Sequence, residues 1–547
     1  MEESAHSTGG RADSNCERGA RPYLRRRPED GVLHRVLREY LETFLEEARA
    51  RGAGEGLPAF VERELREFLS CGVLARGFAR FRCDECGHEM LVAFSCKGRG
   101  FCPSCCGRRM ADLAAHLADD VLGGLPVRQW VLTLPHRLRY ALAWDHKLCR
   151  AVLGVFIRAL LTFERRRAER RGVRAGRSGA VTAIQRFGSA LNLNVHFHTL
   201  AVQGVFVDDA GGGLRFAPNP EPTDLEVAKL LASISRRITR LAKRHGIVLD
   251  RPSEDLDRLD PLANESPLLA GICGASVLGR IATGARAGQP VLRVGRNPDA
   301  PLVTSSGEGQ AHVAGFDLHA NVAAPAGDRT RLEHLCRYVL RPPVAQDALE
   351  LTDQGKVLLT MMRPWHDGTR AILFEPHELI EKLAALIPKP RVNLLLYHGV
   401  LGPSAWLRSA AVMAGEAPLA GATPGLNPDG SGSAAELDTK RGEVDSDPET
   451  APPRPGDGVD QRPGRSRSEP RPHTPWAELL RRTFEIDVLA CPGCGGRLRL
   501  LATIEEPEVV RKILSHLGIP TECPEPLPAR SPPLTTSFST LFDIRDG

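Results

Sequence analysis

The sequence predicts an α+β protein built on an antiparallel sheet, and three observations lead to this fold class. Between residues 126 and 410, strand-like segments are mixed with helical ones without a regular strand–helix–strand repeat. A cysteine-rich block precedes this region, and a stretch rich in Gly, Pro, Ser, Asp and Arg follows it. We therefore expect a helical cysteine-rich domain, an antiparallel-sheet domain with helices, a disordered linker and a small C-terminal segment. The expected boundaries are 1–30 (disordered), 31–125, 126–410, 411–474 and 475–547.

The secondary structure follows from hydrophobic periodicity. Apolar residues at helical spacing predict the helices, beginning with Val32, Leu33, Val36 and Leu37. Alternating or β-branched runs bounded by turn residues predict the strands. The expected helices cover 32–51, 60–69, 111–121, 148–169, 224–245, 329–340 and 377–386. The expected strands cover 180–187, 195–207, 214–217, 312–323, 357–361 and 371–374.

Composition excludes several classes of protein. The 72 Lys and Arg against 67 Asp and Glu give a net charge of +5, which favours nucleic acid only weakly. No run of about 18 uncharged apolar residues is present, so we expect no membrane partner. The first 30 residues lack the apolar core of a secretory signal. We expect a cytoplasmic, nucleoid-associated bacterial protein whose 14 Cys are reduced and available for metal or redox chemistry.

Two cysteine pairs have the spacing of a zinc site. Cys83-x2-Cys86 and Cys102-x2-Cys105 are separated by 15 residues, which matches a four-cysteine site. Four thiolates leave no position for a catalytic water, so the predicted zinc is structural. Redox dithiols or packed thiols are the alternatives. Three further residues of the block can replace a ligand or serve a second ion: His88, Cys96 and Cys106.

A third pair, Cys491-x2-Cys494, has no matching second pair in the sequence. Cys523 and His516 are possible completions of a metal site. A turn with free thiols is the alternative.

A catalytic constellation is indicated by His196-Phe197-His198 and Tyr338. Strand alternation places both imidazoles on one face, where they can hold a divalent ion with open positions, although two hydrogen-bonded histidines are an equal alternative. Tyr338 lies between Arg337 and Arg341 on an expected helix, where it can also be an ordinary amphipathic residue. Together they suggest attack on a phosphodiester: the metal polarises the phosphate, and the tyrosyl oxygen displaces a 3′-hydroxyl to leave a 5′-phosphotyrosine.

At this point the chain resembles a known family. The segments QRFGSALNLNVHFH, LCRYVLRPP, RPWHDGT, YHGVLGP, SCKGRGFCPSC and RQWVLTLPHRLRY are similar to those of the IS91 family of rolling-circle transposases, which are HUH single-strand endonucleases. The resemblance runs from about residue 35 to 410 and resumes around 487–500. It implies that the zinc-binding domain helps to recognise DNA and that an HUH domain nicks and rejoins single-stranded DNA. Pro342 stands where some members carry a second tyrosine, which indicates the single-tyrosine branch.

The resemblance also implies cofactors and partners. His196 and His198 are expected to bind Mg2+ or Mn2+, and Tyr338 is expected to be the nucleophile. The partners are single-stranded DNA at transposon ends and target DNA. The sequence has no G-x4-G-K-[ST] motif, so a host helicase or replication machinery is expected to separate the strands.

For the third metal ligand we favour His319, in GFDLHANV, over His334, with Gln185 third. A buried, hydrogen-bonded strand residue is the alternative for His319. Gln185 and Asn194 can also orient ligands or DNA.

Two groups of arginines are predicted to contact DNA phosphates, one ahead of the expected catalytic strands and one beside Tyr338. They are Arg165, Arg166, Arg167, Arg170, Arg171, Arg174 and Arg177, with Arg337 and Arg341. A solvated helix end is the alternative for the first group. A plasmid rolling-circle replication initiator, a metallohydrolase and a zinc-dependent DNA-binding protein with a decayed nuclease are the rival functions.

Overall fold

The computed structural model describes residues 21–23, 25–51, 55–209, 213–249, 261–300, 307–416, 476–484 and 486–530. The predicted disorder over 1–30 and the predicted linker at 411–474 therefore lie mostly outside the described residues, as does the end of the C-terminal segment. Among the described residues, no helix combines the length and apolar character needed to cross a membrane.

A six-stranded sheet forms the centre of the fold and confirms the expected α+β class. Its strand order is β10-β11-β4-β6-β5-β15, and every neighbouring pair is antiparallel. The strand β6 is hydrogen-bonded on both sides, to β4 and β5. The six strands are β4 (Val127–Thr133), β5 (Gly179–Phe187), β6 (Leu193–Val202), β10 (Gln310–Val313), β11 (Phe316–Ala324) and β15 (Leu395–Gly399).

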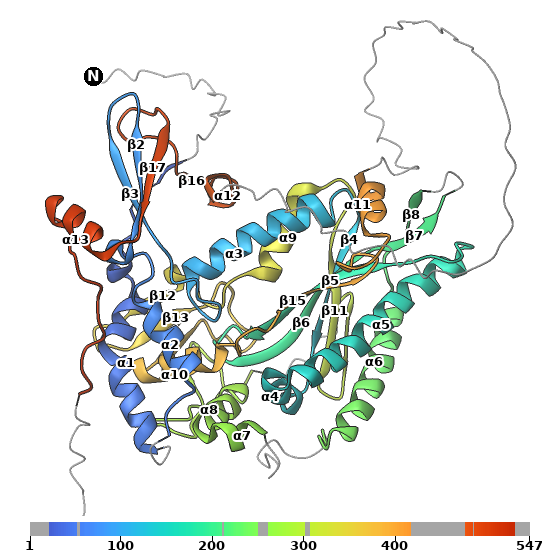
Figure 1. Cartoon of the computed structure of the whole chain (residues 1–547). Helices are drawn as coiled ribbons and strands as arrows, with labels where there is room; N and C mark the ends of the chain where they lie inside the picture. The colour runs from blue at the N-terminus through green and yellow to red at the C-terminus, as the bar shows by residue number, and fades with distance from the viewer. Residues whose placement is uncertain are drawn as a thin grey trace, which may run out of the picture. The chain divides into compact units, whose positions relative to one another are not determined.

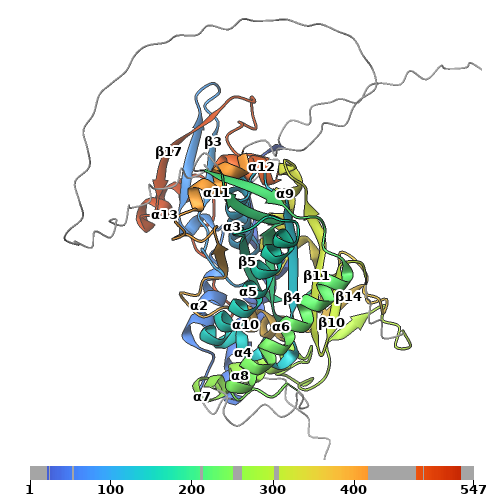
Figure 2. The same cartoon turned by 90° about the vertical axis from the view of Figure 1, so that its right-hand side faces the viewer.

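Helices cover both faces of this sheet (Figures 1 and 2). On one face lies α5 (His146–Arg170), whose Phe156 stacks on Phe197 of β6 with ring centroids 6.4 Å apart. Phe163 of α5 meets Trp130 of β4 edge to face at 5.7 Å, and α6 (Asp224–Arg244) packs beside α5 and over β10 and β11. The other face is approached by α9 (Arg329–Leu340), which contacts β5 and β11 and is covered by α3 (Pro103–His116).

A second, four-stranded antiparallel sheet has the order β12-β13-β14-β9. The almost completely buried helix α10 (Pro376–Leu386) packs against it and against α1 and α8. The remaining elements of this region are α4 (His136–Trp144), β7 (Gly204–Asp208), β8 (Leu214–Pro218), α7 (Pro261–Glu265), α8 (Pro267–Val277), β9 (Leu292–Val294), β12 (Leu349–Leu351), β13 (Val357–Thr360), β14 (Ala371–Phe374) and α11 (Arg408–Glu416).

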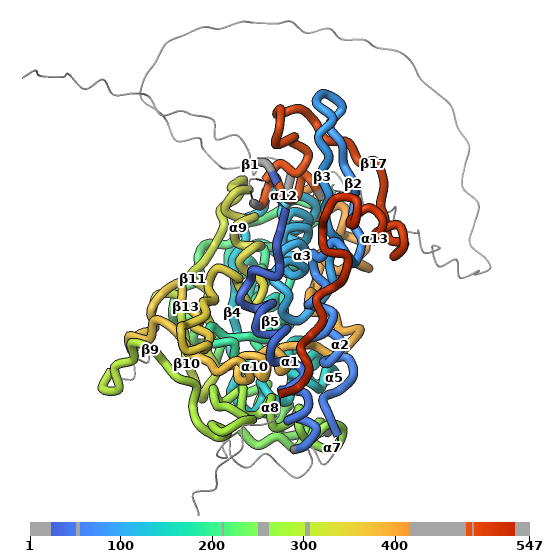
Figure 3. Tube along the Cα trace, turned by 90° about the vertical axis from the view of Figure 1, so that its left-hand side faces the viewer, coloured from blue at the N-terminus to red at the C-terminus, as the bar shows by residue number. Residues whose placement is uncertain are grey.

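The two ends of the described chain fold together (Figure 3). The C-terminal strand β17 (Leu498–Ile504) joins the hairpin of β2 (Phe78–Cys83) and β3 (Glu89–Ala93) in the order β17-β2-β3. Beyond it the chain runs along the N-terminal helix, where Leu527 N donates to Arg38 O at 2.7 Å. The other elements of these ends are β1 (Arg21–Pro22), α1 (Val32–Arg51), α2 (Ala59–Phe68), α12 (Trp476–Phe484), β16 (Ile486–Asp487) and α13 (Pro507–His516).

Some boundaries differ from the sequence-based ones for local reasons. The expected strand 195–207 is two strands, because Gly204 breaks it with a φ of 154°. The expected helix 111–121 begins earlier, since Pro103 at its first position follows the Cys102 cap, and its last turn (Leu117–Val121) is a π-helix. The strands β4 and β15 were not anticipated.

The apolar core is continuous across the expected boundary at residue 125, running from Leu33 of α1 to Ile387 after α10. In its centre Phe197 is fully buried between the sheet and α5.

We expect Phe197→Ala to lower the free energy of unfolding by about 3–5 kcal/mol, because it leaves a cavity in a packed core. Leu225→Ala is the control, since Leu225 is 63% exposed on α6 and should change stability by less than about 0.5 kcal/mol. Urea unfolding followed by fluorescence measures both. Equal stabilities of the two variants would contradict the central position of Phe197.

Candidate functional site

The histidines lie on the face of the sheet opposite Phe197. In the antiparallel register His196 lies between Thr133 of β4 and Gln185 of β5, and His198 lies between Val131 and Ala183. Side chains directly opposite each other share a face, so His196 and Gln185 are immediate neighbours on it. The strand β11 continues these rows, with Asp317 opposite Thr133 and His319 opposite Val131. One sheet face thus collects His196, His198, Gln185, Asp317 and His319, whereas large apolar side chains such as Phe197 and Trp130 lie on the other.

The two imidazoles meet directly. His196 Nε2 and His198 Nε2 are 3.0 Å apart, and the rings are buried. His196 Nδ1 donates to the Asn194 carbonyl at 2.8 Å, so its Nε2 carries the lone pair. Burial lowers the pKa of His196 to about 4 and the pKa of His198 well below its ordinary value. Both rings are therefore neutral at neutral pH, which is the form that binds metal ions.

Gln129 of β4 fixes the second ring, and the sequence analysis missed it. Its amide nitrogen donates to His198 Nδ1 at 2.7 Å, which leaves the His198 proton on Nε2. To offer both Nε2 lone pairs to a cation, His198 has to carry its proton on Nδ1, and Gln129 then has to present its amide oxygen. Strand alternation could have indicated Gln129, because Gln129, Val131 and Thr133 lie on one face of β4. The sequence did not lead us to predict a strand there.

Among the three candidates for a third ligand, Gln185 lies nearest the pair in the sheet. Its Nε2 donates to Val339 O at 2.6 Å, while its Oε1, within the described structure, is buried without a hydrogen-bond partner. His319 is one strand further away, and its Nε2 lies 3.2 Å from Asp317 Oδ1. His334 is exposed on α9. By strand register Gln185 is therefore the direct neighbour of His196, whereas His319 lies across β4 from His198, near enough for its charge to help lower the pKa of His198.

Tyr338 is presented over the same face by α9. The buried residues of this helix are Leu332, Glu333, Leu335, Cys336 and Val339. Tyr338 lies outside this set and is 48% exposed. Its ring centroid is 5.9 Å from that of His198, and the Arg341 guanidinium lies 4.5 Å from the ring centroid. The structure thus brings together Tyr338, His196, His198 and Arg341, which are separated by up to 145 positions in the chain.

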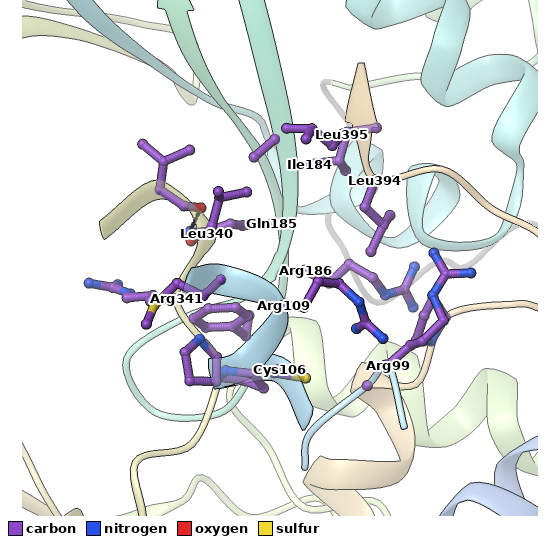
Figure 4. A pocket seen from close by; sticks show the side chains of 18 of the residues that line it. Arg99, Cys106, Arg109, Ile184, Gln185, Arg186, Leu340, Arg341, Leu394 and Leu395 are labelled. Carbon is purple, nitrogen blue, oxygen red and sulfur yellow. Dashed lines mark hydrogen bonds between the residues drawn. The ribbon is translucent and has the colours of Figure 1, made fainter. Parts of the chain in front are cut away.

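A cavity of about 240 Å3 adjoins this group (Figure 4). Gln185, Leu340 and Arg341 line it on the side of the site, and Arg99 and Arg109 line it on the side of α3. Its remaining wall is largely apolar, from Ile184, Leu394 and Leu395 among others. Arg186 is buried and donates to the carbonyls of Ala143, Ala385 and Leu386. Guanidinium groups beside apolar surface suit a nucleotide, which has both a phosphate and a flat base.

The basic segment at the end of α5 is only partly available to DNA. Arg165, Arg166, Arg170, Arg171 and Arg174 are exposed, although Arg170 pairs with Glu226 at 2.9 Å and Arg171 donates to the Pro218 carbonyl.

The prediction of DNA contact is wrong for Arg167. Its side chain is 4% exposed, it donates to the carbonyls of Pro220 and Glu221, and it lies 3.4 Å from Glu226. Through these contacts the buried Arg167 guanidinium links α5 to the loop before α6 and to α6 itself.

The cysteines form two separate groups of four. One consists of Cys71, Cys96, Cys102 and Cys105, and the other of Cys83, Cys86, Cys491 and Cys494. Within the described residues, these are the only sets of three or more His, Cys, Asp or Glu whose ligand atoms all lie within 4.8 Å of one another. The sulfur separations of 3.5 to 3.7 Å are close to the edge of about 3.8 Å expected for a tetrahedral ZnS4 site.

The predicted grouping of Cys83, Cys86, Cys102 and Cys105 as one site is therefore wrong. The hairpin β2–β3 explains why: Cys83 and Cys86 lie at its turn, whereas Cys96 follows its open end. The six residues of β2 separate these ends by roughly 17 Å at about 3.3 Å per residue, far more than one zinc site can span.

The other sulfur and nitrogen candidates lie outside both groups. The sequence did not predict Cys71 as a ligand, because no second Cys lies near it in the chain. Its position just before the hairpin was the only available indication. Cys106 is buried, which raises its pKa to about 12. Three further candidates do not enter a group: His88, His516 and Cys523.

Comparison with known protein families gives two matches. Residues 179–406 match a family model described as "Putative transposase", and residues 36–134 match one described as "Transposase zinc-binding domain". The first match contains the histidine pair and Tyr338, and the second contains both cysteine pairs predicted from the sequence, which supports structural zinc. No curated protein and no solved structure matches the chain.

Replacing Cys71 should remove one equivalent of zinc, because a structural site with three thiolates binds the ion far more weakly. Cys106→Ala is the matched control, since Cys106 is adjacent in space but belongs to neither group. Atomic emission on purified Cys71→Ala and Cys106→Ala measures the difference. Unchanged zinc in Cys71→Ala would refute this ligand set.

Proposed function

This chain belongs to the IS91-family transposases, and we propose that it nicks and rejoins single-stranded DNA at the ends of its element through a 5′-phosphotyrosine on Tyr338. The observation that carries the proposal is the Tyr338 ring, 5.9 Å from a buried histidine pair on an antiparallel sheet. The partners are single-stranded DNA at the transposon ends, target DNA and a host helicase. The match of the N-terminal region to a transposase zinc-binding domain favours this function over a plasmid replication initiator.

The reaction conserves the phosphodiester energy. The Tyr338 phenol oxygen bonds to phosphorus, the bond to the 3′ oxygen breaks, and that oxygen leaves as a hydroxyl with the phenol proton. A free 3′-hydroxyl then attacks the phosphotyrosine, which restores the DNA bond and returns the proton to Tyr338. No high-energy cofactor is needed. Bound Mg2+ or Mn2+ would polarise the scissile phosphate.

His196 and His198 would hold the metal ion through their Nε2 atoms, and we now favour Gln185 as the third ligand. Its Oε1 is a buried acceptor without a partner, directly beside His196 in the sheet. His319 has Asp317 as a partner and lies across β4 from His198. Rigid strands on either side of β6 would keep this set in place.

The DNA strand would pass through the cavity between α3 and the sheet. Arg341 lines the cavity and also lies over Tyr338, so it can contact a phosphate next to the reacting one. Arg99 and Arg109 supply positive charge on the opposite wall. Exposed Arg165 and Arg166 would extend the contact surface at the end of α5.

A single tyrosine would serve the reaction, because position 342 is Pro. Tyr397 lies on β15 at the edge of the sheet, opposite Val181, with Arg408 over its ring. It is thus separated from β6 by β5.

We expect Tyr338→Phe to abolish the covalent protein–DNA adduct and strand cleavage while leaving DNA affinity nearly unchanged, because only the nucleophilic oxygen is lost. The assay incubates full-length protein with single-stranded terminal DNA and Mn2+ and separates adducts on a denaturing gel. Tyr397→Phe should behave like wild type. An adduct that persists in Tyr338→Phe and disappears in Tyr397→Phe would move the nucleophile to Tyr397.

For the third ligand, we expect Gln185→Ala to raise the Mn2+ concentration that gives half-maximal nicking by about tenfold or more. His334→Ala is the control and should titrate like wild type, because His334 is exposed one helical turn from Tyr338. A larger shift in His319→Ala than in Gln185→Ala would return the assignment to His319.

A further inference from the structure

The group of Cys83, Cys86, Cys491 and Cys494 joins two segments from opposite ends of the chain. Cys83 Sγ lies 3.5 Å from Cys494 Sγ, and Cys86 Sγ lies 3.6 Å from Cys491 Sγ. Cys491 and Cys494 fall outside both family matches, which end at residues 134 and 406. Each segment supplies only half of the ligands, so neither can close a tetrahedral site by itself.

The two pairs are built as equivalent turns. The N–H of Gly87 donates to the Cys83 carbonyl at 3.0 Å, and the N–H of Gly495 donates to the Cys491 carbonyl at 2.9 Å. Both glycines have positive φ, 73° and 76°, which a residue with a side chain adopts at a cost. A turn of this kind directs two sulfurs to one point, and two such turns facing each other complete four ligands.

The strand β17, which follows the Cys491–Cys494 turn, also joins the C-terminal segment to the hairpin. In β17, Leu498 pairs with Cys83 and Ile504 pairs with Phe78 of β2. The shared apolar cluster beneath the sulfurs is small. It contains Phe81, Cys83, Met90, Val92, Cys491 and Leu498. The other end of the three strands packs on a second cluster, which includes Phe78, Val510 and Leu514. At the end that carries the sulfurs, so small a core gives little hydrophobic stabilisation, and a bound ion would add to it.

The helix just before the second turn, α12, packs on α3 and reaches the helix that carries Tyr338 through polar contacts. Arg482 Nη2 is 2.9 Å from Glu333 Oε2 on α9, and Arg482 Nη1 is 2.6 Å from Asp119 Oδ2. Arg337, next to Tyr338, donates to the Thr483 carbonyl at 3.2 Å. The Glu333 side chain is 5% exposed, and Arg329 lies 3.1 Å from it, so loss of Arg482 would remove one of the partners of a buried carboxyl group.

We propose that Cys83, Cys86, Cys491 and Cys494 bind a second zinc ion that fastens the C-terminal segment to the β2–β3 hairpin and thereby holds α12 against α9. Arg482 is then a positioning residue, which acts on Tyr338 through Glu333 and the helix. The metal site stands on the cysteine geometry alone. The effect on nicking rests in addition on the proposed function.

The first measurement is the zinc content of full-length protein by atomic emission. Wild type should hold two ions per chain, one for each group of four cysteines, and Cys491→Ser combined with Cys494→Ser should hold one. Cys523→Ser is the control within the same segment and should keep both ions. Two ions in the double variant would overturn the site.

The second measurement is hydrogen exchange of α9 and α12, which needs no activity. Exchange in both helices should be faster in the double cysteine variant and in Arg482→Ala, which keeps both zinc ions. Arg481→Ala is the matched control, because Arg481 is exposed and pairs only with Glu478 of its own helix among the described ion pairs. Unchanged exchange in α9 after loss of one zinc ion would overturn the fastening role.

The third measurement is the rate of adduct formation at saturating DNA and Mn2+. It should fall by about tenfold or more in Arg482→Ala, since small displacements of a reacting group are costly, while DNA affinity and zinc content stay at the wild-type values. A wild-type rate in Arg482→Ala would overturn the positioning role. Absence of any adduct in wild type would instead refute the proposed function, and zinc content and exchange would still decide the metal site and the fastening.

Discussion

The site depends on the position of β6 between β4 and β5. Hydrogen bonds on both sides fix its register, and the burial of Phe197 against Phe156 fixes which face is apolar. A slip of one residue would turn Phe197 to the polar face and both histidines into the core. Such a slip is excluded by the loss of apolar burial and by the cost of two imidazoles without hydrogen-bond partners. The same packing that stabilises the sheet therefore positions the histidines.

The position of Tyr338 is set by the contacts of its helix, α9. Its helix is anchored by one apolar side and by a set of charges in which Glu333 and Asp119 meet Arg329 and Arg482. These contacts constrain the helix while the tyrosine itself stays half exposed. In the proposed reaction, the Tyr338 phenol would have to reach a phosphate from solvent and still keep a fixed position relative to the histidine pair. Contacts on the other sides of α9 fix the helix and leave the Tyr338 ring accessible.

The N-terminal hairpin shows how a small element is stabilised without a large core. It has β17 added at one edge, and its apolar residues fall into two small clusters, one near the turn and one near the open end. A group of four cysteines lies at each end of the hairpin, where bound zinc would add to this limited burial. Because one of these groups includes Cys491 and Cys494, and β17 pairs with β2, the two ends of the described chain meet at this hairpin.

The sequence by itself was enough to predict the features that depend only on residues close together in the chain. The alternation around His196 and His198, the helical face that leaves Tyr338 outside and the three Cys-x2-Cys turns all follow from local periodicity or spacing. Only the tertiary structure decided how these parts combine. The meeting of Cys83 with Cys494, the place of Cys71 among the cysteines, the contact of Gln129 with His198 and the position of Gln185 beside His196 depend on strand order and register. Contacts between residues distant in the chain set these, and no local pattern encodes them.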